Sequence, residues 1–126
     1  MAKSYKELEI WNKGIEIADK IYDVTSNFPK EETYGIAAQM RRSAISIPSN
    51  IAEGFARQFN REYRQFLYVA LGSCAELETQ VVLAHRRNYM SAKNSEELGE
   101  KIDHESRMLT NMIKAVSRSL RVNRPE

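Results

Sequence analysis

Hydrophobic residues recur along most of the chain at alternating spacings of three and four positions, which is the repeat of one face of an α-helix. No stretch competes with this pattern by showing the two-residue alternation of a half-buried β-strand. Proline and glycine, with 3 and 5 residues, are scarce, so the chain has few turns. The pattern therefore predicts an all-α protein with four long helices, at about residues 4–28, 34–58, 61–89 and 95–122.

The predicted helices are separated by residues that are typical of helix ends. Pro29 disfavours helix in the residue before it, and Thr33 and Asn60 are the expected N-caps of the second and third helices. Asn94 followed by Glu97 has the spacing of a capping box. Long helices with short connections lie antiparallel to their neighbours, so we expect an up-down-up-down antiparallel four-helix bundle that forms one domain over the whole chain, residues 1–126.

The first predicted helix is apolar on two faces, which lie roughly 120° apart. One stripe contains Leu8, Trp11, Ile15, Ala18 and Tyr22, and the other contains Ile10, Ile17, Ile21, Val24 and Phe28. A peripheral helix needs only one apolar stripe. Either this helix is deeply buried, or one stripe meets the core and the other meets a second subunit. For the second case we assign the subunit interface to Ile10, Ile17, Ile21 and Val24.

The segment "RRSAISIPSNIAEG", residues 41–54, places a proline inside the second predicted helix. An interior proline removes one helical hydrogen bond and costs roughly 3 kcal/mol, so a break into two helices is one interpretation. The apolar stripe nevertheless keeps its phase across Pro48, through Met40, Ala44, Ile47, Ile51 and Phe55. We therefore predict one helix that is bent near Pro48.

A polar stripe on the second helix faces a matching set on the third. Its members are Ser46, Asn50 and Glu53 on the second helix and Ser73 and Glu76 on the third. We interpret these residues as a hydrogen-bonded polar layer that sets the register of the two helices. The alternative is a carboxylate site in which Glu53 and Glu76 perform acid–base chemistry or hold a metal ion.

Other residues that commonly carry chemistry are not grouped in the sequence. The Glu-x-x-His pairing of di-iron bundles is absent, and His85 and His104 lie outside any metal-ligand spacing. The single cysteine, Cys74, falls on the apolar stripe of the third helix, where a small buried residue is expected. The sequence therefore predicts no enzymatic activity, no catalytic residues, no metal and no cofactor.

The basic residues gather at one end of the predicted bundle, although the net charge is only +2. In the fourth helix, acids at the start and bases at the end complement the helix dipole, which accounts for that polarity without a ligand. The same argument does not explain arginines at the start of the third helix. A basic end near aromatic residues is typical of a surface that binds the phosphate backbone of RNA or DNA, although a charged face is more often simply solvated. The candidate residues are Arg57, Arg61, Arg64, Arg118, Arg121 and Arg124.

The cellular location follows from what the sequence lacks. The segment "MAKSYKELEIWNKG" has no apolar core of a signal peptide, and no apolar run approaches 18 residues. One cysteine forms no internal disulfide, which fits a reducing compartment. We expect a cytoplasmic protein that makes no membrane contact.

Three segments resemble one protein family. They are "LEIWNKGIEIADKIY", "QMRRSAISIPSNIAEG" and "YRQFLYVALGSCAELETQV", and the likeness spans roughly residues 5–120. They are similar to the 23S rRNA-intervening-sequence protein family, also called the four helix bundle protein family. The resemblance implies a four-helix bundle that assembles as a homopentamer and for which no enzymatic activity is established.

The resemblance also suggests partners. Some members of the family are encoded in sequences inserted in bacterial 23S rRNA genes. The accessory variability proteins of diversity-generating retroelements resemble this fold, and they are basic pentamers that bind nucleic acid and the reverse transcriptase. The expected partners are therefore further copies of the chain, RNA or DNA, or a protein such as a reverse transcriptase or another polymerase.

Overall fold

Four α-helices run along nearly the whole chain: α1 (Glu9–Thr25), α2 (Ile36–Phe55), α3 (Asn60–Arg86) and α4 (Ala92–Asn123). Two short 3-10 helices, η1 (Tyr5–Glu7) and η2 (Lys30–Glu32), precede α1 and α2. The structure is a computed structural model that describes residues 2–123, with side chains up to residue 120. Over residues 2–123 it contains no strand, so the predicted all-α class is confirmed.

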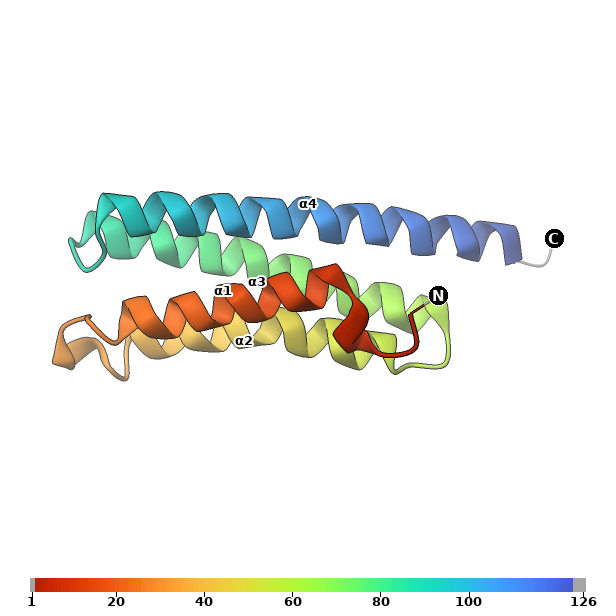
Figure 1. Cartoon of the computed structure of the whole chain (residues 1–126), viewed down its shortest axis with the longest axis horizontal. Coiled ribbons are helices and arrows are strands. Elements are labelled where there is room, and N and C mark those ends of the chain that lie inside the picture. Colours follow the sequence, from red (N-terminus) through yellow and green to blue (C-terminus); the bar gives the residue numbers. More distant parts are fainter. Residues whose placement is uncertain (1, 124–126) are drawn as a thin grey trace.

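The helices pack as an up-down-up-down bundle (Figure 1). Consecutive helices lie antiparallel and in contact, and α1 also contacts α4, which closes the bundle. This order agrees with the predicted topology, because the short connections leave each helix no other neighbour to pair with. The chain start, the α2–α3 turn and the end of α4 therefore meet at one end of the molecule.

The core is one continuous cluster that takes a stripe of residues from every helix. These stripes repeat at three- and four-residue spacings, as the sequence predicts for amphipathic helices. The fully buried large apolar side chains come from all four helices: Ile17, Ile21, Met40, Ile47, Ile51, Leu67, Leu77, Leu98, Ile102 and Leu109.

Helix α2 continues through Pro48, which is buried. The alternative of two separate helices is therefore wrong, and the uninterrupted phase of the apolar stripe gives the reason. Burial of Ala44, Ile47 and Ile51 on one face holds both halves against the same neighbours. The bend at Pro48 stays a prediction.

The start of the first helix differs from the prediction, because Ser4 caps η1 instead of α1. The Ser4 hydroxyl accepts the Lys6 N–H at 3.2 Å, and the Glu7 carboxylate accepts the Ser4 N–H at 3.0 Å, which makes a capping box. Leu8 is then extended, with φ −77° and ψ 131°. Helix α1 consequently begins at Glu9.

The predicted N-caps of the second, third and fourth helices are each displaced. The Thr33 N–H bonds the Lys30 carbonyl at 3.1 Å, so Thr33 ends η2 and Gly35 precedes α2. Asn60 is the first residue of α3, after Phe59. The Ser91 hydroxyl accepts the Asn94 N–H at 3.1 Å, so Ser91 caps α4 three residues earlier than predicted.

The third helix ends at Arg86 because Asn88 takes a left-handed conformation, with φ 64°. Asparagine tolerates this conformation better than most residues. The next N–H, of Tyr89, turns back to the Ala84 carbonyl at 2.9 Å, which is the bond of a Schellman motif. The prediction that this helix reaches Tyr89 is therefore wrong by three residues.

Helices α2 and α3 approach most closely at Gly54. A Cβ atom placed there would lie 2.7 Å from the Phe66 Cβ and 3.0 Å from the Tyr63 ring. Such crowding forces the backbones apart, so we expect Gly54→Ala to lower the free energy of unfolding by about 2 kcal/mol. Urea denaturation measures this loss.

A matched control is Gly99→Ala in α4. A Cβ atom at Gly99 meets no atom within 4 Å, so the gain in helix propensity acts alone. We expect this variant to gain about 0.5–1 kcal/mol. Equal effects of the two substitutions would contradict the close approach at Gly54.

Candidate functional site

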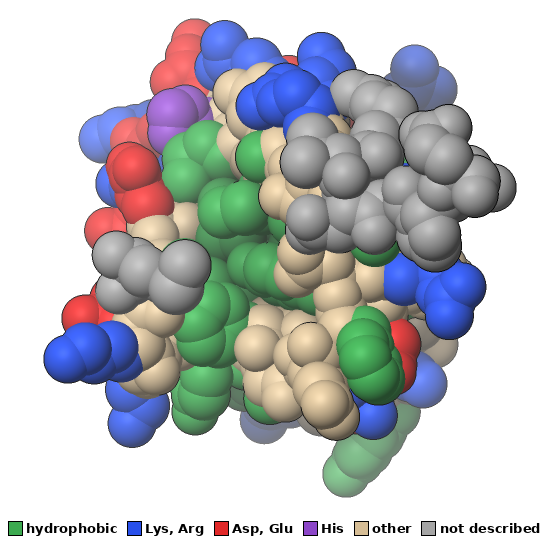
Figure 2. All heavy atoms as spheres, turned by 90° about the vertical axis from the view of Figure 1, so that its right-hand side faces the viewer, with side chains coloured by type: hydrophobic (Ala, Val, Ile, Leu, Met, Phe, Trp, Pro, Cys, Tyr) green, Lys and Arg blue, Asp and Glu red, His purple; other side chains and the backbone are tan. Residues whose placement is uncertain are grey.

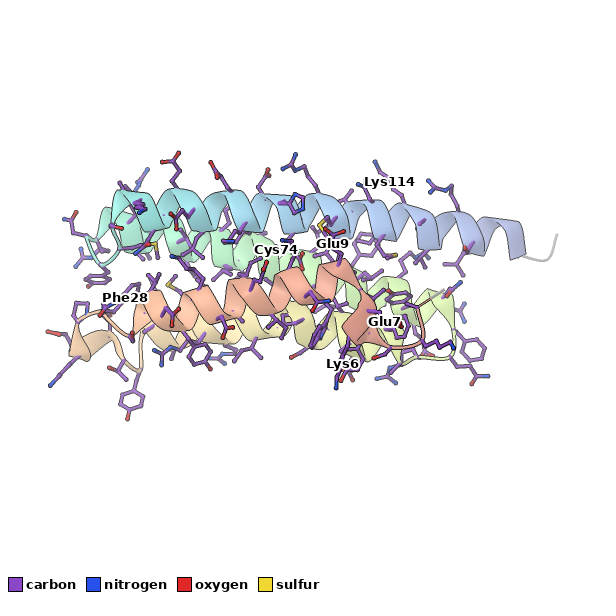
Figure 3. All side chains as sticks on the ribbon, in the orientation of Figure 1. Lys6, Glu7, Glu9, Phe28, Cys74 and Lys114 are labelled. Atoms are coloured by element: carbon purple, nitrogen blue, oxygen red, sulfur yellow. The ribbon has the colours of Figure 1, made fainter. Side chains whose placement is uncertain are left out.

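The basic residues that the sequence singled out gather where the chain start, the α2–α3 turn and the end of α4 meet, and we call this the basic end. Figure 2 looks onto it, and Lys and Arg side chains lie around its rim with hydrophobic side chains between them. Lys6 and Lys114 project outward on opposite sides of the bundle near this end (Figure 3). Asp and Glu side chains also lie on this rim, mostly on the left of the view, so the positive charge is spread around the end and does not form one compact patch.

Two arginines of the basic end are held by neighbouring side chains. Arg57 bonds the Glu53 carboxylate at 3.0 Å, and its guanidinium lies 4.8 Å from the centre of the Phe66 ring. Arg64 is half-buried and reaches the Ser117 hydroxyl across the α3–α4 contact at 3.4 Å. These two side chains connect elements of the bundle and are less available to a ligand.

Arg61 and Arg118 are exposed, and within residues 2–120 neither forms an ion pair. They are therefore the freest cations among the predicted candidates. The Arg121 side chain and the whole of Arg124 lie outside the described part of the chain.

Of the three aromatic residues Tyr5, Phe59 and Tyr63, Phe59 is the one available for stacking on a base. Phe59, in the α2–α3 turn, is exposed. Tyr63 instead packs edge-on against Phe55 at 6.0 Å between ring centres, and burial raises the pKa of its hydroxyl above the ordinary value. Tyr5 packs against Trp11 at 5.3 Å.

The predicted polar layer is assembled in part. The Ser73 hydroxyl donates to the Ser46 hydroxyl at 2.8 Å, and the Asn50 amide donates to the Ser46 hydroxyl at 2.9 Å. Glu76 joins α2 elsewhere, by accepting the Ser43 hydroxyl at 2.8 Å. Glu53 does not take part, because it lies on the surface and pairs with Arg57.

The two carboxylates of the alternative interpretation are thus engaged with different partners. Among the described residues, no three His, Cys, Asp or Glu side chains come together as a metal site. Cys74 is fully buried, as predicted, and burial raises the pKa of its thiol to about 12. Figure 3 places it between the layers of the bundle.

The predicted subunit interface is wrong. Ile10, Ile17, Ile21 and Val24 are only 4, 1, 0 and 6% exposed, because this stripe of α1 faces the core. The other stripe of α1 is the outer one, and its Ile15 and Tyr22 are exposed. The spacing identified both stripes, but it contained no information on which one turns inward.

Helix α3 carries an apolar face on its outer side. Tyr68, Val69, Val82 and Leu83 are each about half exposed. The small residues Gly72, Ala75 and Thr79 are also exposed and continue this face at helical spacing, so we call these seven residues the α3 outer face.

The composition of α3 is unusual for a bundle helix of this size. Within residues 2–123 it is the one helix long and apolar enough to cross a membrane, yet only 33% of its most apolar window is buried. Helices of this length and hydropathy in water-soluble proteins are usually buried in the core. Its apolar character comes from having one face in the core and the α3 outer face outside.

The polar residue that the sequence analysis missed is Glu105, on the core side of α4. It is 0% exposed, and neither carboxyl oxygen has a hydrogen-bond partner within the described residues. Burial raises the pKa of this carboxyl to about 8, Lys13 lowers it and Glu9 raises it. The ordinary value is 4.5.

Glu105 lies against Gly14 of α1. A Cβ atom at Gly14 would meet the Glu105 Oε2 atom and the Pro48 ring, each at 3.3 Å. The signal in the sequence is a gap in the α4 stripe between Ile102 and Leu109, which Glu105 fills. Gly14 fills the equivalent gap in the α1 stripe.

Both the sequence and the fold of this chain are similar to those of known proteins. The chain matches the family model of the 23S rRNA-intervening sequence protein over residues 6–111. No curated protein matches it.

A solved structure from Bacteroides thetaiotaomicron VPI-5482, a protein with unknown function from the S23 ribosomal protein family, is similar. The TM-score is 0.78 at 24% identity, over 83% of this chain and 98% of that chain. This likeness shows a shared fold, and the family match covers most of the chain. The protein therefore belongs to the 23S rRNA-intervening sequence protein family.

Proposed function

We propose that this protein is a non-catalytic, homo-oligomeric four-helix bundle that binds RNA or DNA through its basic end. The observation that carries the proposal is the pair of exposed arginines, Arg61 and Arg118, which no acid neutralises within the described residues. Arg61 stands near the start of α3, where the helix dipole disfavours positive charge. A phosphate ligand removes that conflict, because it supplies the missing negative charge.

The exposed Phe59 adds a second element to this surface. It lies in the α2–α3 turn, two residues before Arg61, and offers a flat apolar face. Single-stranded nucleic acids bind to surfaces that combine cations for the backbone with aromatic rings for the bases. In the polar layer the Ser73–Ser46 hydrogen bond joins α3 to α2 and the Asn50–Ser46 bond lies within α2, so these residues favour a structural role over a catalytic one.

Assembly would strengthen weak individual contacts. We propose a homopentamer, as the family resemblance implies, in which the α3 outer face of one subunit packs against the exposed apolar residues of α1 and α2 on the next. The exposed apolar residues in question are Ile15 and Tyr22 of α1 and Ile45 of α2. Two different patches on one subunit suit a head-to-tail contact, which closes into a ring.

A ring of this kind presents every basic end on the same side. One nucleic-acid strand then meets several copies of Arg61 and Arg118, so that the second contact forms at a high effective concentration. The affinity of the assembly would therefore exceed that of one subunit by a wide margin, and it would depend strongly on salt.

The test is the binding of the full chain to a structured RNA and to a single-stranded DNA over a series of salt concentrations. We expect the double variant Arg61→Glu and Arg118→Glu to bind more weakly and to lower the slope of affinity against salt by about 2 or more. The matched control is Arg86→Glu with Lys93→Glu, which makes the same charge change at the opposite end.

The control distinguishes a localised surface from a general effect of net charge. Retained binding in the control and lost binding at the basic end support the proposal. Equal loss in both double variants, or no detectable binding of the wild type at low salt, would overturn it.

A second candidate function is a protein-interaction scaffold, for a reverse transcriptase or another polymerase, without direct nucleic-acid contact. The α3 outer face favours it, since an exposed apolar face of this extent is typical of a protein interface. Affinity capture with and without nuclease separates the two functions. A partner that persists after nuclease treatment would favour the scaffold, and a partner that vanishes with nuclease would favour nucleic-acid binding.

A further inference from the structure

Glu105 is the one buried acid of the described residues, and the proposed function makes no use of it. Both of its carboxyl oxygens are shielded from water and lack hydrogen-bond partners within the described residues. A carboxylate in such a place has neither a counterion in contact nor solvent, so its charged form is strongly disfavoured. The closed structure therefore requires the neutral, protonated carboxyl.

The surroundings of Glu105 show where water would enter. The groove between α1 and α4, which we call the α1–α4 seam, contains two hollows. One, of about 230 Å³, is lined by Lys13, Glu16, Ile17, Glu100, Lys101 and His104. The other, of about 320 Å³, is lined by Leu8, Glu9, Ile10, Met108, Asn111, Met112 and Ala115. Glu105 lies between them along α4, so both approach it from the same seam.

Contact between the helices at this point depends on Gly14. Its lack of a side chain lets α1 lie directly over the Glu105 carboxyl and the Pro48 ring. No α1 side chain at this position therefore shields or binds the carboxyl. An outward movement of α1 would take Gly14 off the Glu105 carboxyl, and water from the seam could then reach its oxygens.

We propose that the α1–α4 seam is a proton-controlled latch: protonated Glu105 keeps α1 closed on α4, and loss of that proton releases α1 from α4. This device is independent of nucleic-acid binding and goes beyond the proposed function. It depends on the packing of the bundle, because Glu105 and Gly14 stand where the apolar stripes of α4 and α1 are interrupted.

The charged and titratable groups around Glu105 set the direction of each effect. From α1, Lys13 favours the ionised carboxylate and Glu9 opposes it. From α3, the Cys74 thiol stays neutral at physiological pH, because burial raises its pKa to about 12. From α2, the contact with Gly14 beside Glu105 is made by the uncharged Pro48 ring. On α4 itself, Lys101 and His104 are exposed and line the first hollow.

Lys13 supplies the counterion of the open state. In the closed structure its ammonium group pairs with Glu16 at 3.3 Å on the surface of α1. Lys13 directly precedes Gly14, so an opened seam lets the ammonium group turn towards the ionised Glu105. Removing Lys13 should therefore make opening harder.

The experiment uses Trp11, the single tryptophan, which lies on α1 and packs partly against the core. Its emission and its quenching by acrylamide report movement of α1, while circular dichroism reports total helix content. In the full-length protein we expect quenching to rise with a midpoint near pH 8 while helix content stays constant. Glu105→Gln, a neutral side chain of the same shape, should lose this transition.

Two further variants test whether Glu105 is the group whose ionisation causes the transition. Glu9→Gln removes an acid on the exposed side of the same seam, and it should keep the transition and move its midpoint to lower pH. Lys13→Met should move the midpoint to higher pH. Any of three results overturns the proposal: no wild-type transition between about pH 6.5 and pH 9.5 (about one and a half pKa units either side of the midpoint), an unchanged transition in Glu105→Gln, or a lower midpoint in Lys13→Met.

Discussion

The folded protein loses stability as the pH rises through the window from about 4.5 to about 8, because Glu105 binds its proton more tightly in the folded state than in the unfolded chain. Below the unfolded value both states are protonated, and the stabilising contribution is fully present. Above it the unfolded chain releases the proton while the folded protein keeps it, so stability falls until the folded carboxyl also ionises. The expected loss is roughly 3–5 kcal/mol across the window.

A loss of this size is a large part of the stability of a small domain. Urea denaturation of the full chain at several pH values measures it directly. Glu105→Gln cannot ionise, so we expect its unfolding free energy to stay level over the window and to exceed that of the wild type at pH 8. Cys74 does not interfere, since burial holds its pKa at about 12.

The matched control for this prediction is Glu100→Gln. Glu100 lies on the same helix but is exposed, so its removal changes the net charge equally without touching the buried site. This variant should keep the wild-type slope of stability against pH. If Glu105→Gln also kept that slope, the buried carboxyl would not be the group responsible.

Replacing Val82 with Asp should convert the proposed homopentamer into monomers. Val82 stands on the α3 outer face, next to small residues that let two helices approach closely. An unpaired carboxylate buried at such a contact is costly, because it loses its water without gaining a partner. Light scattering should give several times the chain mass of 14.6 kDa for the wild type and one chain mass for Val82→Asp.

Tyr34→Asp serves as the control for assembly. Tyr34 is 95% exposed in the connection between α1 and α2 and is not one of the seven residues of the α3 outer face. The Tyr34→Asp substitution introduces the same charge in place of an exposed aromatic residue and should leave the particle mass unchanged. A monomeric wild type, or an intact assembly in Val82→Asp, would rule out the proposed interface.

The helix boundaries show how far local sequence patterns reach. The existence of the four helices followed from the three- and four-residue spacing, because a shared face depends only on helix geometry. Their ends were less predictable. Near the start of α2, Thr33 and Gly35 are both suited to capping, and near the start of α4, Ser91 and Asn94 are. The Thr33 N–H bonds the Lys30 carbonyl and the Asn94 N–H bonds the Ser91 hydroxyl, which leaves Gly35 and Ser91 as the residues that precede the helices.

The candidate site was predictable to a smaller extent. The sequence placed Ser46, Asn50 and Ser73 on facing stripes, and the structure joins them by hydrogen bonds. Glu53 belonged to the same stripe, yet its longer side chain reaches Arg57 one turn away and stays in water. Helical spacing assigns a residue to a face, but side-chain length and available partners determine where its polar atoms end up.

The sequence by itself indicated the helical class through residue spacing, the antiparallel order through the short connections, and the family through the likeness of three segments. Only the tertiary structure decided which stripe of α1 turns inward and that Glu105 meets Gly14 in a dry core. The physical reason is that burial depends on what the neighbouring helices present. In the sequence, Glu105 is only an interruption of the apolar stripe of α4. The structure shows that Gly14 of the facing helix α1 gives its carboxyl room but no hydrogen-bond partner.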